Sequence, residues 1–198
     1  CLLPVAPPKL TVKINNANKT VTLINEGQIN LLKKAELTDL EFEKIKTHTM
    51  TGFKLLQELN VDSHILKAAL MHHERYDGTG YPSKLHDTQI DIYARYISII
   101  DAYEAMTSAR TYRQSKTPFE VVEIFEKDAF KYDIELLRPI LSHIANHMVG
   151  LNVRLSNDQI AEVILINQNK MGRPVVRTTS GEIIHLAHKK GISITGIY

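Results

Sequence analysis

The spacing of apolar residues changes twice along the chain, and these changes constrain the fold more than any other feature. Residues 10–24, LTVKINNANKTVTLI, alternate apolar and polar side chains around an Asn-rich centre, which is typical of a β hairpin. Residues 38–148 repeat apolar side chains at helical spacing, and after residue 150 the period returns to two. The sequence therefore predicts a mainly α protein with a short N-terminal β hairpin segment (1–30), a helical domain (31–148) and a small C-terminal β subdomain (149–198).

Capping signals predict where the central helices begin. TDLE at 38–41 and TPFE at 117–120 both have the capping-box pattern, in which a Thr hydroxyl and a Glu carboxylate bond reciprocally to the first-turn amides. The predicted helices cover residues 38–59, a stretch from Asp62–Ser63 to near His73, 92–108, a stretch starting at Thr117, and about 134–147, where Pro139 either kinks the helix or marks its first turn. The later segments NVRLS, AEVILIN, RPVVRTT, EIIHLA and ISITGIY predict five short strands in a small curled sheet or barrel.

Composition excludes several classes of function. The 198 residues carry a formal net charge of +2, so we do not expect duplex nucleic acid as a partner. No apolar run approaches the roughly 20 residues that a membrane-spanning helix needs. The opening CLLPVAPP has three prolines and no basic leader, so we do not expect a signal peptide. A single cysteine, Cys1, excludes an intrachain disulfide, and we expect a cytoplasmic protein.

Four residues of metal-ligand type fall within the helical zone. His48 lies on the apolar face of the first predicted helix, His72 and His73 end the second, and Asp101 interrupts the apolar run ISIIDAYEAM. A carboxylate buried among isoleucines is strongly destabilised unless it is paired or binds a metal. Imidazoles together with a carboxylate suit iron, manganese or zinc.

Each of these residues also has a simpler interpretation. A single histidine on an apolar face is usually a hydrogen-bonded core residue. Asp101 could cap a helix or pair with Arg95 or Arg110, and histidines at a helix C-terminus interact favourably with the helix dipole. On the residues alone, a metal site and a structural role both stay open.

Two further motifs surround these residues. The loop DGTGYP follows His73 closely; Gly80 allows close approach of a ligand, and Tyr81 can stack on a base. SARTYR places Arg110 and Arg113 just after the Asp101 helix, where guanidinium groups suit phosphate. An ordinary tight turn and a solvated turn are the respective alternatives.

Three segments together resemble the HD-GYP family of bacterial phosphodiesterases, which hydrolyse cyclic di-GMP. LTDLEFEKIKTHTMTG is similar to the segment with the family's metal-binding histidine, HHERYDGTGYP fits the signature HHExxDGxGYP without a mismatch, and ARYISIIDAYEAMTSARTYR is similar to the aspartate helix and arginine turn. The resemblance implies an HD-type helical bundle over roughly residues 31–147 and a cyclic di-GMP phosphodiesterase that yields linear pGpG and/or GMP. It further implies cyclic di-GMP as ligand, a diguanylate cyclase partner at the GYP loop, and a homodimer.

The resemblance also assigns roles to individual residues. It implies a di- or trinuclear transition-metal centre, iron or manganese, with His48, His72, His73 and Asp101 as ligands. The implied substrate-binding residues are Gly80, Tyr81, Pro82, Glu104, Arg110 and Arg113. Glu104 stands where the family commonly has Asp, and Ala109 and Thr111 replace its usual Asp and Pro, which puts substrate fit and rate in question but not the metal ligands.

One departure concerns the pair for which the family is named. A His-Asp pair should precede LLKKAELTD by a short segment, but residues 1–38 contain neither histidine nor aspartate. Either the polypeptide holds the pair in a stretch that this sequence omits, which we favour because the signature is intact, or the protein is a degenerate module. Such a module would bind cyclic di-GMP or a partner protein without cleavage.

Overall fold

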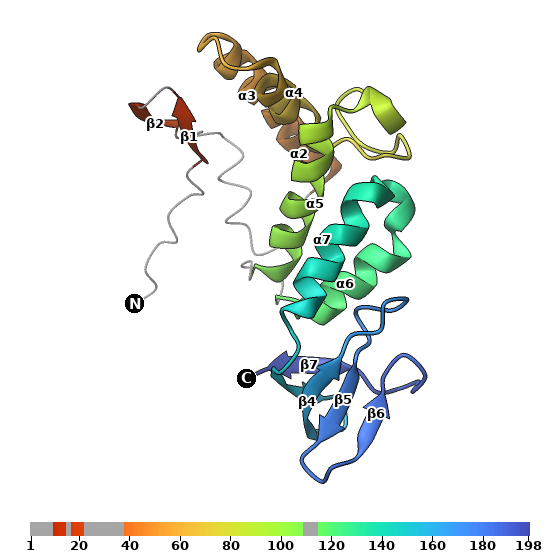
Figure 1. Cartoon of the computed structure of the whole chain (residues 1–198). Coiled ribbons are helices and arrows are strands. Elements are labelled where there is room, and N and C mark those ends of the chain that lie inside the picture. The colour runs from red at the N-terminus through yellow and green to blue at the C-terminus, as the bar shows by residue number, and fades with distance from the viewer. Residues whose placement is uncertain (1–9, 15–16, 22–37, 109–114) are drawn as a thin grey trace.

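The molecule is built as a column with helices at one end and a sheet at the other. Figure 1 shows this computed structural model, which describes residues 10–14, 17–21, 38–108 and 115–198. Helices α2 (Asp39–Lys46), α3 (His48–Gln57) and α4 (Ser63–Met71) lie at one end, and α5 (Ile92–Thr107) runs through the middle. Next come α6 (Pro118–Lys127) and α7 (Ile134–Asn146), and the C-terminal sheet closes the other end.

The helix boundaries follow the capping signals. Both predicted capping boxes are confirmed, at the start of α2 and at the start of α6. The first predicted helix is divided into α2 and α3 at Thr47, whose hydroxyl donates to the Lys44 carbonyl oxygen at 2.7 Å and so competes with the helical bonding pattern. Pro139 lies inside α7 rather than in its first turn. Two 3₁₀ turns complete the helical part, η1 (Asp87–Gln89) and η2 (Ala129–Lys131).

The C-terminal strands form the five-stranded sheet that their alternation predicts. They are β3 (Asn152–Leu155), β4 (Ile160–Leu165), β5 (Val175–Thr178), β6 (Ile183–His185) and β7 (Ile194–Ile197), ordered β6-β5-β4-β3-β7 with antiparallel neighbours. Because β6 and β7 stand at opposite edges, these strands make an open sheet rather than a closed barrel.

Two further strands precede the helices. β1 (Leu10–Ile14) and β2 (Ala17–Val21) pair antiparallel, with Leu10 opposite Val21. That residues 1–30 form a distinct N-terminal β segment stays a prediction.

The main apolar core lies between α6, α7 and the sheet. Phe119 and Phe125 of α6 are each 1% exposed, and they pack in one cluster with Leu137 of α7 and with Val153 and Val163 of the sheet. The β4–β5 connection approaches α6 so closely that a Cβ on Gly172 would lie 2.7 Å from the Phe119 carbonyl oxygen. This apolar core is continuous across residue 149, where the sequence predicts a boundary between two subdomains.

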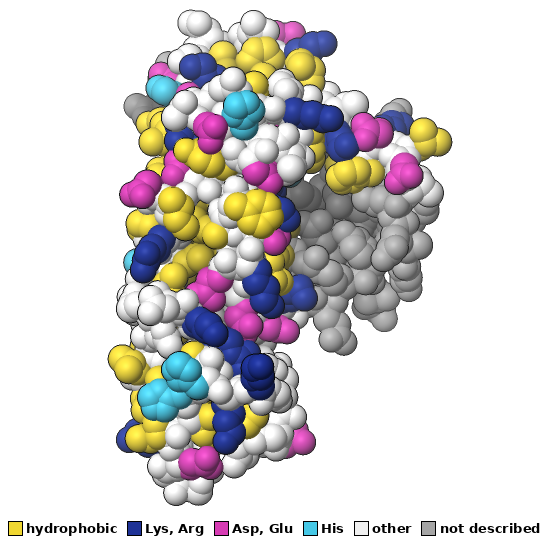
Figure 2. All heavy atoms as spheres, turned by 90° about the vertical axis from the view of Figure 1, so that its right-hand side faces the viewer, with side chains coloured by type: hydrophobic (Ala, Val, Ile, Leu, Met, Phe, Trp, Pro, Cys, Tyr) yellow, Lys and Arg dark blue, Asp and Glu magenta, His cyan; other side chains and the backbone are white. Residues whose placement is uncertain are grey.

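The opposite end of the column is much less buried. Helix α2 has no buried residue, and α3 and α4 bury only Thr49, Leu56 and Ala68. The large apolar side chains exposed on α2 to α5 are Leu40, Phe42, Met50, Leu55, Ile65, Ile92, Tyr93, Tyr96, Ile97 and Ile100. Figure 2 shows hydrophobic side chains mixed with charged ones along one side of the column. None of the helices in the described ranges is both long and apolar enough to cross a membrane.

Candidate metal centre

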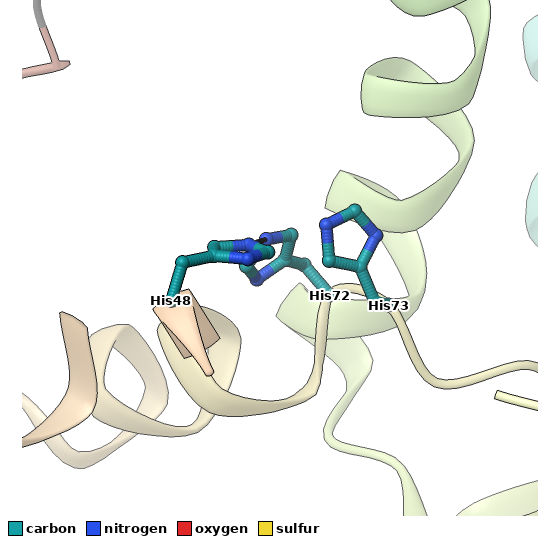
Figure 3. Close-up of side chains that lie close together, drawn as sticks. All are labelled: His48, His72 and His73. Atoms are coloured by element: carbon teal, nitrogen blue, oxygen red, sulfur yellow. Dashed lines mark hydrogen bonds between the residues drawn. The ribbon is translucent and has the colours of Figure 1, made fainter. Parts of the chain in front are cut away.

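Three histidines from two separate segments meet between α3, α4 and α5. His48 is the first residue of α3, whereas His72 ends α4 and His73 follows it. One ring nitrogen of each lies within 4.8 Å of those of the other two. Figure 3 shows the rings of His48 and His72 approaching each other, with His73 beside the neighbouring helix. Residues 24 positions apart in the sequence thus form one cluster.

Backbone carbonyls set the tautomers of two of these histidines. Nδ1 of His48 lies 2.6 Å from the Ile45 carbonyl oxygen, and Nδ1 of His72 lies 2.9 Å from that of Ala69. Because a carbonyl oxygen only accepts, both Nδ1 atoms donate, and in the neutral form of each ring the Nε2 atom is left as a bare acceptor. These two Nε2 atoms face each other at 3.2 Å.

Two facing acceptors repel each other unless a cation lies near both. Neighbouring nitrogens bound at about 2.1 Å to one ion lie about 3 to 3.4 Å apart. The separation of the two Nε2 atoms, 3.2 Å, falls within that range. The Nδ1–H···O=C bonds are also the outer contacts that commonly orient metal-binding histidines. The cluster could therefore hold a divalent metal ion.

Asp101 approaches the cluster from α5. One of its carboxylate oxygens lies 3.8 Å from Nδ1 of His73. The prediction that Asp101 is buried among isoleucines is wrong: its side chain is 41% exposed, as are large parts of Ile97 and Ile100. The alternative pairing with Arg95 is also wrong, because Arg95 instead binds the Asp133 carboxylate at 2.7 Å. Asp101 is thus open to solvent and directed toward the histidines.

The surroundings of His72 and His73 favour their neutral forms. Burial, followed by the charges of His72, His48 and Arg75, lowers the pKa of His73 to about 2. Burial and then the neighbouring His48 also lower the pKa of His72. Neutral imidazoles are the form that binds metal ions, so these two histidines do not have to lose protons at neutral pH before they bind one.

The DGTGYP loop folds back onto the cluster. The Tyr81 ring stacks on the His73 ring with centroids 4.7 Å apart, and its backbone N–H donates to the His73 carbonyl oxygen at 3.2 Å. Burial raises the pKa of the Tyr81 phenol to about 12, so the hydroxyl stays neutral and can donate a hydrogen bond. Gly80 lies against the backbone of Glu74 and Arg75, and a Cβ there would be 2.4 Å from either.

A groove of about 1040 Å³ opens beside this loop. His73, Gly80, Tyr81 and Pro82 form part of its wall. The wall also includes five cationic residues: Lys46, Lys54, Arg75, Lys84 and Lys131. Sequence reasoning missed these cations, although Arg75 lies within the signature and Lys46 only two residues before His48. A positive groove at a candidate metal site suits an anionic ligand.

Three more of the predicted substrate-binding residues are Glu104, Arg110 and Arg113. Arg110 and Arg113 lie outside the described residues. Glu104 is exposed on α5, where its carboxylate accepts a hydrogen bond from the Ser108 hydroxyl at 2.6 Å. Their part in binding substrate stays a prediction.

The fold and the site together define a helical protein with a histidine-rich candidate metal centre. The family described as HD domain matches residues 21–136, and the chain belongs to that family. Its curated relatives also agree with the HD-GYP resemblance.

Three relatives illustrate the range of named activities. The chain is 32% identical over 135 residues to the cyclic di-GMP phosphodiesterase PA4108 of Pseudomonas aeruginosa, covering 68% of this chain and 33% of that protein. It is 43% identical over 88 residues to a cyclic di-GMP phosphodiesterase of Thermotoga maritima, covering 43% and 24%. It is 37% identical over 98 residues to the 3'3'-cGAMP-specific phosphodiesterase 1 of Vibrio cholerae, covering 50% and 23%. The chain thus spans a third or less of the length of these relatives.

Proposed function

We propose that this chain forms the metal-dependent phosphodiesterase part of a bacterial protein that hydrolyses cyclic di-GMP. The observation that carries the proposal is the pair of facing Nε2 acceptors of His48 and His72, 3.2 Å apart beside a cation-lined groove. The names of relatives supply the substrate class, and linear pGpG or GMP would be the product.

Some of these residues would bind metal ions, and others would bind the substrate. His48, His72, His73 and Asp101 would hold a centre of two or three iron or manganese ions. Such ions supply a water of lowered pKa and neutralise phosphoryl oxygens during in-line attack. Lys46 and Arg75 in the groove would attract the phosphates, and Tyr81 would stack on a base.

Hydrolysis by the family's mechanism also needs the His-Asp pair. We propose that the pair lies in a stretch outside this sequence, in helices that cover the exposed apolar side chains of α2 to α5. The exposure of Leu40 (84%), Tyr93 (55%) and Ile100 (51%) supports this, since such a surface is normally covered. The intact mass of the protein isolated from its own cells tests it: a mass equal to that of these 198 residues would contradict it.

A non-catalytic binding module is the second candidate. The observation that favours it is the lack of histidine and aspartate in residues 1–38. Such a module would bind the dinucleotide in the same groove without cleaving it. A diguanylate cyclase partner and a homodimer remain predictions from the resemblance alone.

Substitution of a single ligand tests the enzyme proposal. We expect His72→Ala in the full-length protein to remove bound metal and to slow cyclic di-GMP hydrolysis by at least about 100-fold, since even outer contacts of metal ligands are worth about 10- to 100-fold. His143→Ala, which truncates an exposed histidine of α7, is the matched control and should leave both unchanged. Full hydrolysis by His72→Ala would refute the proposed site, and binding without hydrolysis by the unmodified protein would favour the second candidate.

A further inference from the structure

Glu74 is a carboxylate that is almost fully removed from solvent, at 1% exposure. One carboxylate oxygen accepts from the Ser83 backbone N–H at 2.7 Å, and the other accepts from the Leu85 N–H at 3.0 Å. A buried carboxylate is tolerated only when such donors replace its hydration. Both donors lie in the loop that follows Glu74, so the buried carboxylate holds this loop by its backbone amides.

The loop also contacts the segment around Glu74 through its backbone. The Tyr81 N–H donates to the carbonyl oxygen of His73 at 3.2 Å, and the Asp87 N–H donates to that of Tyr76 at 3.0 Å. At Gly80 the two backbone segments meet, because a Cβ there would lie 2.4 Å from the Cα of Glu74. The position of Gly80 and Tyr81 is therefore defined relative to Glu74.

Two residues next to these contacts, His73 and Tyr81, belong to the candidate site. His73, directly before Glu74, is one of the three clustered histidines, and Tyr81 stacks on it with ring centroids 4.7 Å apart. Tyr81 and His73 both line the groove, whereas Glu74 is buried and is not part of its wall. A shift of the loop would separate the stacked rings and change the shape of the groove wall.

We propose that Glu74 is a positioning residue that fixes Tyr81 against His73 and so sets the part of the groove that receives a base of the dinucleotide. The identity of the substrate in this proposal rests on the proposed function, whereas the positioning of Tyr81 by Glu74 does not. Glu74 is not among the residues that line the groove, and its carboxylate accepts hydrogen bonds from the amides of Ser83 and Leu85 rather than from any of the three histidines.

The test compares Glu74→Gln with the same substitution at another glutamate that accepts hydrogen bonds from two backbone amides. Glutamine keeps the shape but has one acceptor oxygen, so one of the two loop amides loses its partner. Glu126→Gln is the matched control, because Glu126 accepts from the backbone amides of Met171 and Gly172 in the connection between β4 and β5. Both variants are made in the full-length protein, and each is checked for its thermal midpoint and metal content.

We expect Glu74→Gln to accelerate hydrogen exchange of the Tyr81, Ser83 and Leu85 amides by about 10-fold or more, the worth of a hydrogen bond to a charged group. KM for cyclic di-GMP should rise about 10-fold, with a smaller change in kcat and unchanged metal content. Glu126→Gln should leave the exchange of these amides, KM, kcat and the metal content unchanged, even where its thermal midpoint falls as much as that of Glu74→Gln. Gly80→Ala keeps the Glu74 carboxylate but displaces the loop, because its Cβ would clash with the backbone of Glu74 and Arg75, and it should reproduce the rise in KM.

Two results would overturn the proposal. One is an unchanged KM in Glu74→Gln with a fall in thermal midpoint like that of Glu126→Gln, which would leave Glu74 a purely structural role. The other is unchanged exchange at Tyr81. If the unmodified protein binds but does not cleave the dinucleotide, its dissociation constant replaces KM. If it does neither, the proposed function fails, and the exchange of Tyr81 still decides the role of Glu74.

Discussion

The two ends of the column are stabilised in different ways. Around α6, α7 and the sheet, apolar side chains such as Phe119, Phe125 and Val163 are fully buried in one cluster. Around α2 to α4 few residues are buried, and the prominent contacts are polar: clustered histidines, Nδ1 bonds to carbonyl oxygens, and a carboxylate that binds loop amides. The end that carries the candidate site therefore gains less from the hydrophobic effect and depends more on these polar contacts.

Truncation of a core side chain should have the largest effect on the free energy of unfolding, and the effect should differ between the two ends. Phe119→Ala removes a side chain that is 1% exposed, so we expect the free energy of unfolding to fall by about 3 to 5 kcal/mol. Leu56→Ala, at the best-buried apolar position of α3 (7% exposed), should cost about 2 kcal/mol, the low end for such truncations, because the only other buried residue of α3 is Thr49. Urea denaturation followed by circular dichroism measures both. Equal losses would show that the two ends are equally well packed.

Metal removal should affect only the end of the molecule that carries the candidate metal centre. An ion at 100 times its dissociation constant stabilises the folded state by about 2.7 kcal/mol. We expect a chelator to raise hydrogen exchange in α3 and α4, which carry His48 and precede His72, and to leave α6 and the sheet unchanged. His72→Ala serves as control, since the chelator should then have no effect. Equal acceleration at both ends would mean that the molecule unfolds as one unit around its metal.

Sequence reasoning found the elements that local chemistry determines. Capping boxes and strand alternation depend on neighbouring residues. The structure contains the capping boxes predicted at Thr38 and Thr117 and the five predicted C-terminal strands. The meeting of His48 with His72 and His73 was reached through ligand type and resemblance rather than through geometry. The structure adds the facing Nε2 atoms, which depend on the tautomer that the carbonyls of Ile45 and Ala69 select.

What sequence reasoning missed depends on long-range packing. Asp101 interrupts an apolar run, which predicts burial, but the neighbouring Ile97 and Ile100 are themselves exposed. Apolar composition indicates that a helix face needs a partner and does not identify that partner. The cations of the groove were missed for a similar reason, since Lys46 and Lys84 are far apart in the sequence and meet only because the loop folds back.

The two capping boxes provide the smallest and most closely matched test. Thr38 and Thr117 make the same reciprocal bonds, with Thr38 N–H to Glu41 at 2.8 Å and Thr117 N–H to Glu120 at 2.7 Å. Either threonine replaced by alanine should cost its helix about 1 kcal/mol. Because α6 is part of the main core, we expect Thr117→Ala to lower the global free energy of unfolding by that amount. Because α2 buries no residue, Thr38→Ala should leave the global value nearly unchanged and should accelerate amide exchange only in the first turn of α2. Equal global losses in the two variants would show that α2 unfolds together with the core, and the contrast between the two ends would then not extend to their stability.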